Sequence, residues 1–256
     1  MRTAISVLLL LPAVALADSA FDGNWKTRMD SLNVSGRPDA LEVANGVYTC
    51  STCAPEIRVQ ADGVDHPVSG HPYYDTVAVT VLSPTSLRIV DKKTGQEVYN
   101  ITYTVSGDGA TLNARVTDRT GPRVATEAFT ARRVAGGAAG SHACSGSWLA
   151  DRISDANDVL LIITYRMTPE YFSMHWNGHS YLAKFDGQEY PVEGDPAHTT
   201  VSVRRIDDNT VEETDHRDGR VTDEIRMAAA RDGHTIEITD KDPQRGQTTT
   251  VTLDKQ

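Results

Sequence analysis

Three cysteines, Cys50, Cys53 and Cys144, are the first candidates for chemistry in the sequence, because of their type and spacing. Cys50 and Cys53 form a Cys-x-x-Cys pair, a spacing shared by local disulfides, redox centres and zinc sites. A redox pair usually opens a helix in a βαβ unit, whereas the sequence around this one is typical of β-strands. We therefore expect a disulfide between Cys50 and Cys53 that pins a hairpin turn, with pairing of either to Cys144 as the next alternative.

Two other groups of residues have the ligand types of a metal site. Cys50, Cys53, His142 and Cys144 could supply four zinc ligands, but a long stretch of chain separates the first two from the others. His175 and His179 flank the turn residues Asn177-Gly178, and His198 could approach them. Exposed polar residues on a hairpin are the simpler interpretation, since the chain contains no His-Glu-x-x-His motif. We expect no metal site and no cofactor.

Motifs of nucleophilic catalysis and phosphate binding are missing from the sequence. There is no Gly-x-Ser-x-Gly elbow and no P-loop, and acidic pairs such as Asp207-Asp208 fall in turns. The sequence therefore predicts no catalytic residues and a protein that is not an enzyme. A polar pocket with two or more convergent ionisable groups would favour an enzyme instead.

These residues are carried by two copies of one unit. At an offset of 124, 16 of the 57 positions from Asp62 to Asp118 are identical to those from Asp186 to Asp242, without a gap. A unit of this length has the size of a single domain and is too long for a solenoid repeat. We expect domains at 18–133 and 144–256, joined by the Gly/Ala-rich segment 134–143 as a flexible linker.

The first 17 residues read as a secretory signal peptide, with Arg2 before an apolar run and Ala15-Leu16-Ala17 at the cleavage site. The run is too short to span a membrane as a helix. The mature protein is therefore expected in the periplasm or outside the cell, with no membrane span.

Each copy reads as all-β. Segments such as Thr76–Leu82 and Thr111–Asp118 alternate apolar and polar residues, and Asp-Gly pairs between the segments supply tight turns. Many short strands joined by tight turns indicate a small barrel or a sandwich, and closing a sheet removes its edges. The eight strands expected in the first copy lie near residues 24–30, 46–51, 55–61, 75–82, 85–91, 96–106, 111–118 and 124–131.

The most similar string in the two copies joins a turn to a proline-punctuated crossing and the start of a buried strand. Prolines and glycine fix an irregular backbone path there, so we interpret the shared residues as structural and the alternative as a shared binding loop. The shared residues are Asp62, Gly63, Pro67, Gly70 and Pro72 in the first copy and Asp186, Gly187, Pro191, Gly194 and Pro196 in the second.

Each copy opens with Gly-x-Trp, at Gly23-x-Trp25 and Gly146-x-Trp148. This resembles the opening motif of lipocalin-type barrels, and the DGxxxPVxGxP pattern resembles uncharacterised secreted bacterial proteins called lipocalin-like. The resemblance implies two tandem eight-stranded antiparallel barrels, each closed at one end by its tryptophan with a basic residue of the last strand packed across it. Arg132 and Lys255 would fill that role.

The net charge of the chain and its distribution argue against some classes of binding partner. The formal net charge is −10, and residues 18–133 carry 12 basic and 14 acidic side chains, whereas 144–256 carry 12 and 21. The acidic second half would repel a phosphate backbone, which argues against a nucleic-acid partner. We expect an exported, non-enzymatic protein that binds a small hydrophobic molecule inside one or both barrels. The alternative is a protein-interaction or cell-envelope structural module with filled barrels.

Overall fold

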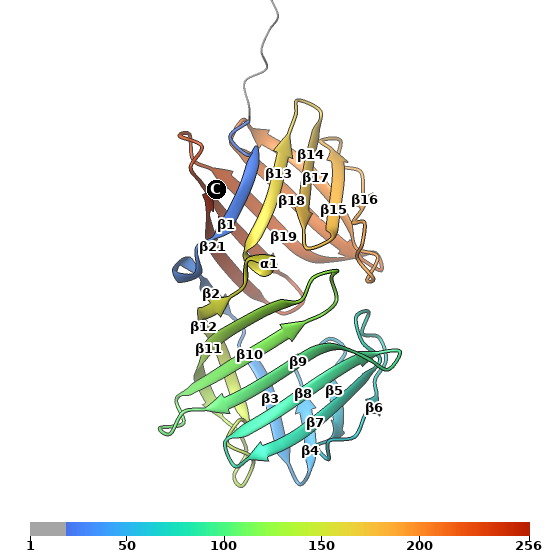
Figure 1. The fold of residues 1–256 in the computed structure, drawn as a ribbon, viewed down its shortest axis with the longest axis vertical. Coiled ribbons are helices and arrows are strands. Elements are labelled where there is room, and N and C mark those ends of the chain that lie inside the picture. Colours follow the sequence, from blue (N-terminus) through green and yellow to red (C-terminus); the bar gives the residue numbers. More distant parts are fainter. Residues whose placement is uncertain (1–18) are drawn as a thin grey trace, which may run out of the picture.

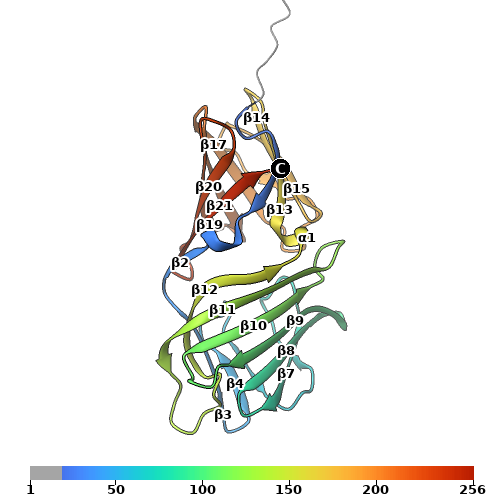
Figure 2. The ribbon, with the colours of Figure 1, turned by 60° about the vertical axis from the view of Figure 1, so that its left-hand side comes forward.

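The computed structural model describes residues 19–256, so the expected signal peptide at residues 1–17 lies outside the described residues. Two antiparallel sheets of ten and eleven strands each curl into a nearly closed barrel. The barrels are stacked along the long axis of the molecule (Figures 1 and 2). None of the helices in the described part of the chain is long and apolar enough to cross a bilayer.

Barrel 1 has the strand order β5-β4-β3-β12-β11-β10-β9-β8-β7-β6. Its strands are β3 (Asp39–Ala44), β4 (Val47–Cys50), β5 (Ile57–Gln60), β6 (His66–Pro67), β7 (Thr76–Ser83), β8 (Ser86–Lys93), β9 (Gln96–Val105), β10 (Thr111–Asp118), β11 (Ala125–Gly136) and β12 (Gly146–Ala156). An isolated bridge between Asp62 and Thr80 joins the chain after β5 to β7, which nearly closes the sheet.

Barrel 2 has the order β15-β14-β13-β1-β21-β20-β19-β18-β17-β16, with β2 also paired to β21. Its strands are β1 (Gly23–Thr27), β2 (Asn33–Gly36), β13 (Ile162–Met167), β14 (Tyr171–Trp176), β15 (His179–Lys184), β16 (Tyr190–Pro191), β17 (Thr200–Asp207), β18 (Thr210–Arg217), β19 (Arg220–Ala229), β20 (Thr235–Asp242) and β21 (Gln247–Lys255). The turn η1 (Met29–Ser31) separates β1 from β2, and the short helix α1 (Asp158–Leu161) precedes β13. A bridge between Ser180 and Glu193 closes this barrel.

The duplication is visible in the strand bounds. Adding 124 to the bounds of β6, β7, β8, β9 and β10 gives those of β16, β17, β18, β19 and β20. The expected all-β architecture of two barrels is therefore confirmed. Each sheet has more strands than the expected eight. In barrel 1 the additional strands are β3 and β6, and β6 has only two residues, too few to show an alternation.

The first strand of each copy lies in the barrel built by the other copy. β1 pairs with β13 and β21 of the second copy, whereas β12 pairs with β3 and β11 of the first. In Figure 1 the blue strand β1 accordingly lies among the yellow and red strands. The two copies thus exchange equivalent first strands, an arrangement like domain swapping within one chain.

This exchange divides the chain differently from the expected domains 18–133 and 144–256. Barrel 1 runs from β3 to β12, and barrel 2 combines β1 and β2 with β13 to β21. The segment 134–143 is not a linker between barrels, because it contains the end of β11 and most of the loop to β12 within barrel 1. The chain passes between barrels after β2 and again through α1 (Figure 2).

The two Gly-x-Trp tryptophans are buried, each near a basic residue from the last strand of the other copy. The ring of Trp148 lies 4.0 Å from the guanidinium carbon of Arg133, and the ring of Trp25 lies 5.4 Å from Lys255 Nζ. The basic residue in copy one is thus Arg133. The expected Arg132 points outward, because neighbouring residues of a strand face opposite sides of the sheet.

Local backbone geometry and packing explain the glycine that both copies of the repeated string contain. Gly70 and Gly194 both have positive φ, +79° and +81°, which favours glycine. A Cβ on Gly70 would lie 2.7 Å from Pro55 Cγ, and one on Gly194 would overlap the backbone of Gly178. In each copy the glycine therefore lets this loop pack directly against the neighbouring hairpin.

The remaining punctuation residues lie in turns and short strands. Asp62 and Asp186 each accept a 3.0 Å hydrogen bond from the backbone N–H two residues later, at the turns that contain Gly63 and Gly187. Pro67 and Pro191 end β6 and β16, where they pair with the first residue of β7 and β17.

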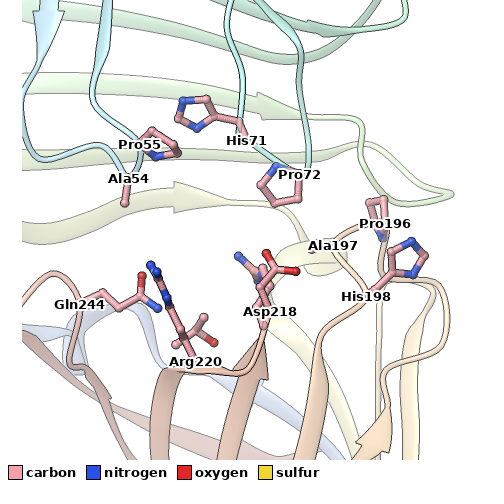
Figure 3. A pocket seen from close by; sticks show the side chains of 13 residues that line it. Ala54, Pro55, His71, Pro72, Pro196, Ala197, His198, Asp218, Arg220 and Gln244 are labelled. Carbon is pink, nitrogen blue, oxygen red and sulfur yellow. The ribbon is translucent and has the colours of Figure 1, made fainter.

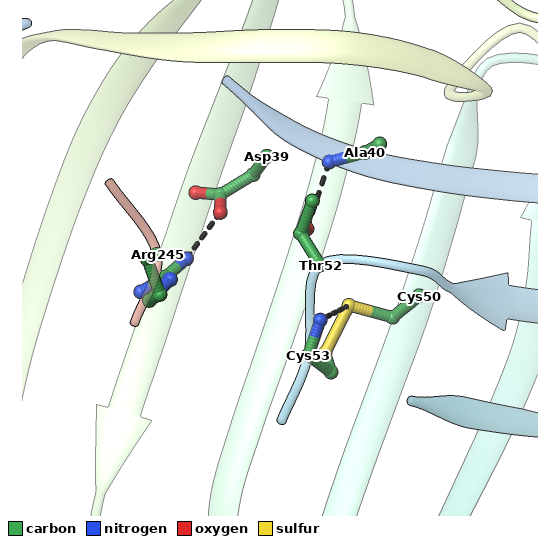
Figure 4. The surroundings of a disulfide bond; sticks show 6 residues. All are labelled: Asp39, Ala40, Cys50, Thr52, Cys53 and Arg245. Carbon is green, nitrogen blue, oxygen red and sulfur yellow. Dashed lines mark hydrogen bonds and ion pairs between the residues drawn. A yellow bond between two sulfur atoms is a disulfide. The ribbon is translucent and has the colours of Figure 1, made fainter. Parts of the chain in front are cut away.

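Cys50 and Cys53 are joined by a disulfide in the turn between β4 and β5 (Figure 4). Thr52 between them accepts a 2.9 Å hydrogen bond from the backbone N–H of Ala40, which ties the turn to β3. An ion pair between Asp39 and Arg245 of the β20–β21 loop links the barrels at the same place. Cys144 is a buried free thiol, and burial raises its pKa to about 11.

Candidate functional site

Among the cavities where the barrels meet, two are larger than the rest. The larger, about 710 Å³, is formed by both copies of the repeated loop, with Gly70, His71 and Pro72 on one side and Pro196 to His198 on the other. Figure 3 shows His71 and Pro72 on one side of the gap and, on the other, Asp218 of the β18–β19 turn and Arg220 at the start of β19.

This inter-barrel cavity has little convergent chemistry. His71 is buried and stacks on Tyr74 with ring centroids 4.7 Å apart, and burial lowers the His71 pKa. His198, Asp218 and Arg220 are exposed. The lining therefore mixes charges of both signs that remain open to water.

The second cavity, about 340 Å³, opens into barrel 2 and combines an aromatic and apolar wall with buried acids. Barrel 2 supplies most of the lining, and barrel 1 covers the mouth with Tyr73, Tyr99, Asp118 and Thr120. The lining residues used below are Met174, Trp176, Tyr181, Val192, Asp195, Thr199, Val201, Glu213, Asp215 and Arg217.

The acids are placed by the alternation of β18. Val211, Glu213, Asp215 and Arg217 follow one another at every second residue, so their side chains share the inner face of the sheet. Val211 lies in the packed core, whereas Glu213, Asp215 and Arg217 line the cavity toward barrel 1. The inner face therefore changes from apolar to charged along one strand.

Glu213 is the central acid of the cavity. Its side chain is only 7% exposed, it accepts a hydrogen bond from the Tyr181 hydroxyl, and it interacts with Asp215. Asp215 Oδ1 is buried and has no hydrogen-bond partner. Burial raises the pKa of Glu213, and burial together with repulsion from Glu213 raises the pKa of Asp215 to about 9.

Two further acids extend the cluster beneath the cavity. Asp223 of β19 pairs directly with Asp215, and Asp240 of β20 lies one strand further along. Burial raises the pKa of both groups, that of Asp240 to about 7. Burial, and after it the repulsion between neighbouring carboxyl groups, favours the protonated forms of these acids.

Tyr73 of barrel 1 covers the mouth of this cavity. Its hydroxyl donates a 3.0 Å hydrogen bond to Asp195 Oδ1, and the guanidinium carbon of Arg217 lies 5.6 Å from the centre of its ring. Arg217 also donates a 3.1 Å hydrogen bond to Thr199 Oγ1. The loop that carries the repeated string in copy one thus covers the barrel built by copy two.

Hydrogen bonds also fix the charge of Asp195. Burial acts to raise its pKa, but hydrogen bonds from Thr199, Ala197 and Tyr73 outweigh burial and lower the pKa. The carboxylate that holds Tyr73 in place is therefore ionised at neutral pH.

The acid cluster is a property of copy two. At the offset of 124, Glu213 corresponds to Ile89, Asp223 to Tyr99 and Asp240 to Val116, so apolar or aromatic residues of copy one are replaced by acids. Only Asp215 has an acidic counterpart, the buried Asp91. Identities between the copies cannot reveal Glu213, Asp223 and Asp240, whereas the differences at the same aligned positions contain the signal.

The residues whose types could have supplied metal ligands are not brought together. Cys50 and Cys53 are consumed by their disulfide. His179 pairs with Trp176 and His175 with Ser180, so the two histidines point to opposite faces of the hairpin. Within residues 19–256, no three His, Cys, Asp or Glu side chains are arranged to hold a metal ion.

Comparisons with known proteins returned no match: no protein-family model, no curated protein and no solved structure matches the chain.

Proposed function

We propose that the protein is an exported, non-enzymatic binding protein that holds a small, largely hydrophobic molecule in the cavity of barrel 2. The observation that carries this proposal is the cavity itself. Its volume of about 340 Å³ lies at the lower end of the range for small-molecule sites. Such sites combine an apolar lining with a few polar groups that orient the ligand, as Met174, Trp176 and Val192 do here beside Glu213.

The proposal assigns the ligand to barrel 2 and not to barrel 1. In barrel 1 the counterparts of Tyr181 and Glu213 are Ile57 and Ile89, which are buried in a packed cluster with Tyr48. The positions that carry the hydroxyl and the acid in barrel 2 are therefore occupied by apolar side chains in barrel 1. In this proposal barrel 2 binds the ligand and barrel 1 supports it.

The family and the location belong to the same proposal. Gly-x-Trp strands with Arg133 and Lys255 near their tryptophans support membership of a lipocalin-like family. The apolar N-terminal segment and the Cys50–Cys53 disulfide support export to an oxidising compartment, the periplasm or the exterior.

The convergent acids favour a second candidate, an enzyme that uses a carboxyl pair. Glycosidases hold their two carboxyl groups about 5 Å or more apart, with the substrate between them. Glu213 and Asp215 instead lie two residues apart on the same inner face of β18, and the charge of Glu213 raises the pKa of Asp215. This arrangement on one strand favours binding over hydrolysis.

The test uses the full mature chain and a hydrophobic fluorescent dye, with Trp176 as the internal reporter. A dye that enters the cavity should quench Trp176, which lines it, while Trp25 and Trp148 are buried in the core clusters. The matched variant Trp176→Phe should lose the quenching while it still binds the dye. Native mass spectrometry of the freshly purified protein would detect a retained ligand.

Absence of both a retained ligand and a Trp176-dependent signal would overturn the proposal. It would favour the alternative of a protein-interaction or cell-envelope structural module.

A further inference from the structure

We propose that the ligand of barrel 2 is an organic cation, an ammonium group on an aromatic or apolar body, with the cationic group paired to Glu213 and Asp215. This inference rests on the proposed function and specifies its ligand class. It starts from the two carboxyl groups that line the cavity together and from the unpartnered Oδ1 of Asp215.

The buried acids have no cation of their own. Among the ion pairs formed within residues 19–256, none includes Glu213 or Asp215. Arg217 lines the same cavity, but the hydrogen bonds of its Nη2 go to Thr199 and Tyr73 at the mouth, and its Nε has no hydrogen-bond partner. Because a buried carboxylate without a partner is costly, a ligand that supplies a positive charge there gains both Coulomb attraction and hydrogen bonds.

The walls around the acids suit a cation with an apolar body. Tyr181 lies beside the carboxyl groups, and Trp176, Tyr73 and Tyr99 line the rest of the cavity. Aromatic faces attract ammonium groups, and this attraction strengthens when water is excluded. An anionic ligand would be repelled by the acids, and a neutral ligand would leave the Asp215 oxygen unsatisfied unless it donates a hydrogen bond.

Charge in the rest of the site supports the same ligand class. The groups facing Glu213 and Asp215 are Tyr181 on β15, Asp223 on β19 and Asp240 on β20, and Arg217 lies further along β18 itself. Asp195 and Asp118 stand at the mouth. Besides the central pair, four acids, Asp223, Asp240, Asp195 and Asp118, lie inside or near the barrel, against one arginine, Arg217.

The proposal predicts that the affinity for a cation depends on pH, because the acids of the site bind protons. Burial raises the pKa of Asp215 to about 9, so at neutral pH the empty site holds protons that an incoming cation must displace. A bound cation favours the ionised carboxyl groups and lowers their pKa. The affinity for a cation should therefore rise with pH, while the affinity for a neutral molecule should not.

The experiment compares three probes of similar shape by isothermal titration calorimetry with the full mature chain. They are 2-phenylethylamine, which is cationic, 2-phenylethanol, which is neutral, and 3-phenylpropanoate, which is anionic. We expect the amine to bind at least about tenfold more tightly than the alcohol, since hydrogen bonds to charged groups contribute that much. The propanoate should bind most weakly, and the amine should bind more tightly near pH 8 than near pH 6.

Variants separate the acid pair from the general charge of the protein. Glu213→Gln should cost the amine about tenfold in affinity and remove most of its advantage over the alcohol. Glu212→Gln is the matched control, because Glu212 neighbours Glu213 on the outer face, where it pairs with Arg204 and Arg226. If Glu213→Gln does not fold by circular dichroism, Asp215→Asn takes its place.

The outcomes separate the two proposals. Equal binding of amine and alcohol, or an unchanged amine affinity in Glu213→Gln, would overturn the cation while the cavity remains a binding site. No binding of the amine would also overturn it. If the hydrophobic dye gives no Trp176 signal and no ligand is retained, the proposed function fails independently of these results.

Discussion

The guanidinium carbon of Arg133 lies 4.0 Å from the ring centre of Trp148, although Arg133 belongs to β11, the last strand of copy one, and Trp148 to β12, the first strand of copy two. Lys255 and Trp25 form the reciprocal pair at 5.4 Å. Each pair joins the two copies, so the exchange of first strands keeps a basic residue near a tryptophan in both barrels. The closing contact of each barrel is therefore also a contact between the repeats.

We expect that substitution of Arg133 strongly destabilises the protein. Its guanidinium donates hydrogen bonds of 2.6, 2.7 and 2.8 Å to the carbonyl groups of Gly109, Ser145 and Ala143. Arg133→Met keeps the apolar stem but leaves these acceptors unpaired, so we expect a loss of about 2–4 kcal/mol in urea unfolding. Arg132→Met, on the exposed neighbour, should change stability by less than about 0.5 kcal/mol. Equal losses in the two variants would contradict this role.

The strand exchange predicts that cutting the chain between the copies will not separate them. A protease site inserted after Ala139 lies in the exposed β11–β12 loop. After cleavage the first fragment still supplies β1 and β2 to barrel 2, and the second still supplies β12 to barrel 1. The nicked protein should elute as one species in size-exclusion chromatography and come apart only in denaturant.

The uncut insertion variant serves as the control for folding. Two independent barrels, each with its own first strand and joined only by a flexible linker, would separate after cleavage under native conditions. That result would contradict the exchanged topology.

The sequence predicted the strands of the repeat well but not the way the copies share them. Alternation and Asp-Gly turns placed 85–91 and 111–118 within two residues of β8 and β10. They could not show which barrel β1 completes, because duplication gives both copies equivalent edges and the residues of β1 suit either one. The acid cluster was within reach, since Glu213 stands opposite Ile89 in the aligned copies, but its meaning depends on which strand faces point inward.

The Cys50–Cys53 disulfide should contribute modestly to stability. It closes a loop of only four residues, for which the loss of chain entropy in the unfolded state corresponds to about 2 kcal/mol. The double variant Cys50→Ala/Cys53→Ala should therefore unfold at a lower urea concentration than the wild type. A reductant should destabilise the wild type and leave the double variant unchanged. A double variant as stable as the oxidised wild type would show that the bond does not hold the turn.

The acid cluster should make the protein less stable as the pH rises. The folded-state pKa is raised from 3.8 to about 9 for Asp215 and to about 7 for Asp240, so between about pH 4 and pH 9 the folded protein binds more protons than the unfolded chain. The stability contributed by those bound protons is full at the acidic end of this window and is lost toward its alkaline end. The melting temperature of the wild type, followed by circular dichroism, should accordingly fall from pH 5 to pH 8.

The variant Asp215→Asn tests whether Asp215 binds one of these protons in the folded protein. The amide cannot ionise, so the melting temperature of the variant should depend less on pH and at pH 8 exceed that of the wild type by at least about 2 °C. Asp208→Asn is the control, since the Asp208 side chain is 90% exposed and its ion pair with Arg205 should contribute little. If the melting temperature of the variant depends on pH as steeply as that of the wild type, other groups bind the titrating protons. A flatter slope together with loss of amine binding would tie proton storage and cation recognition to the same carboxyl groups.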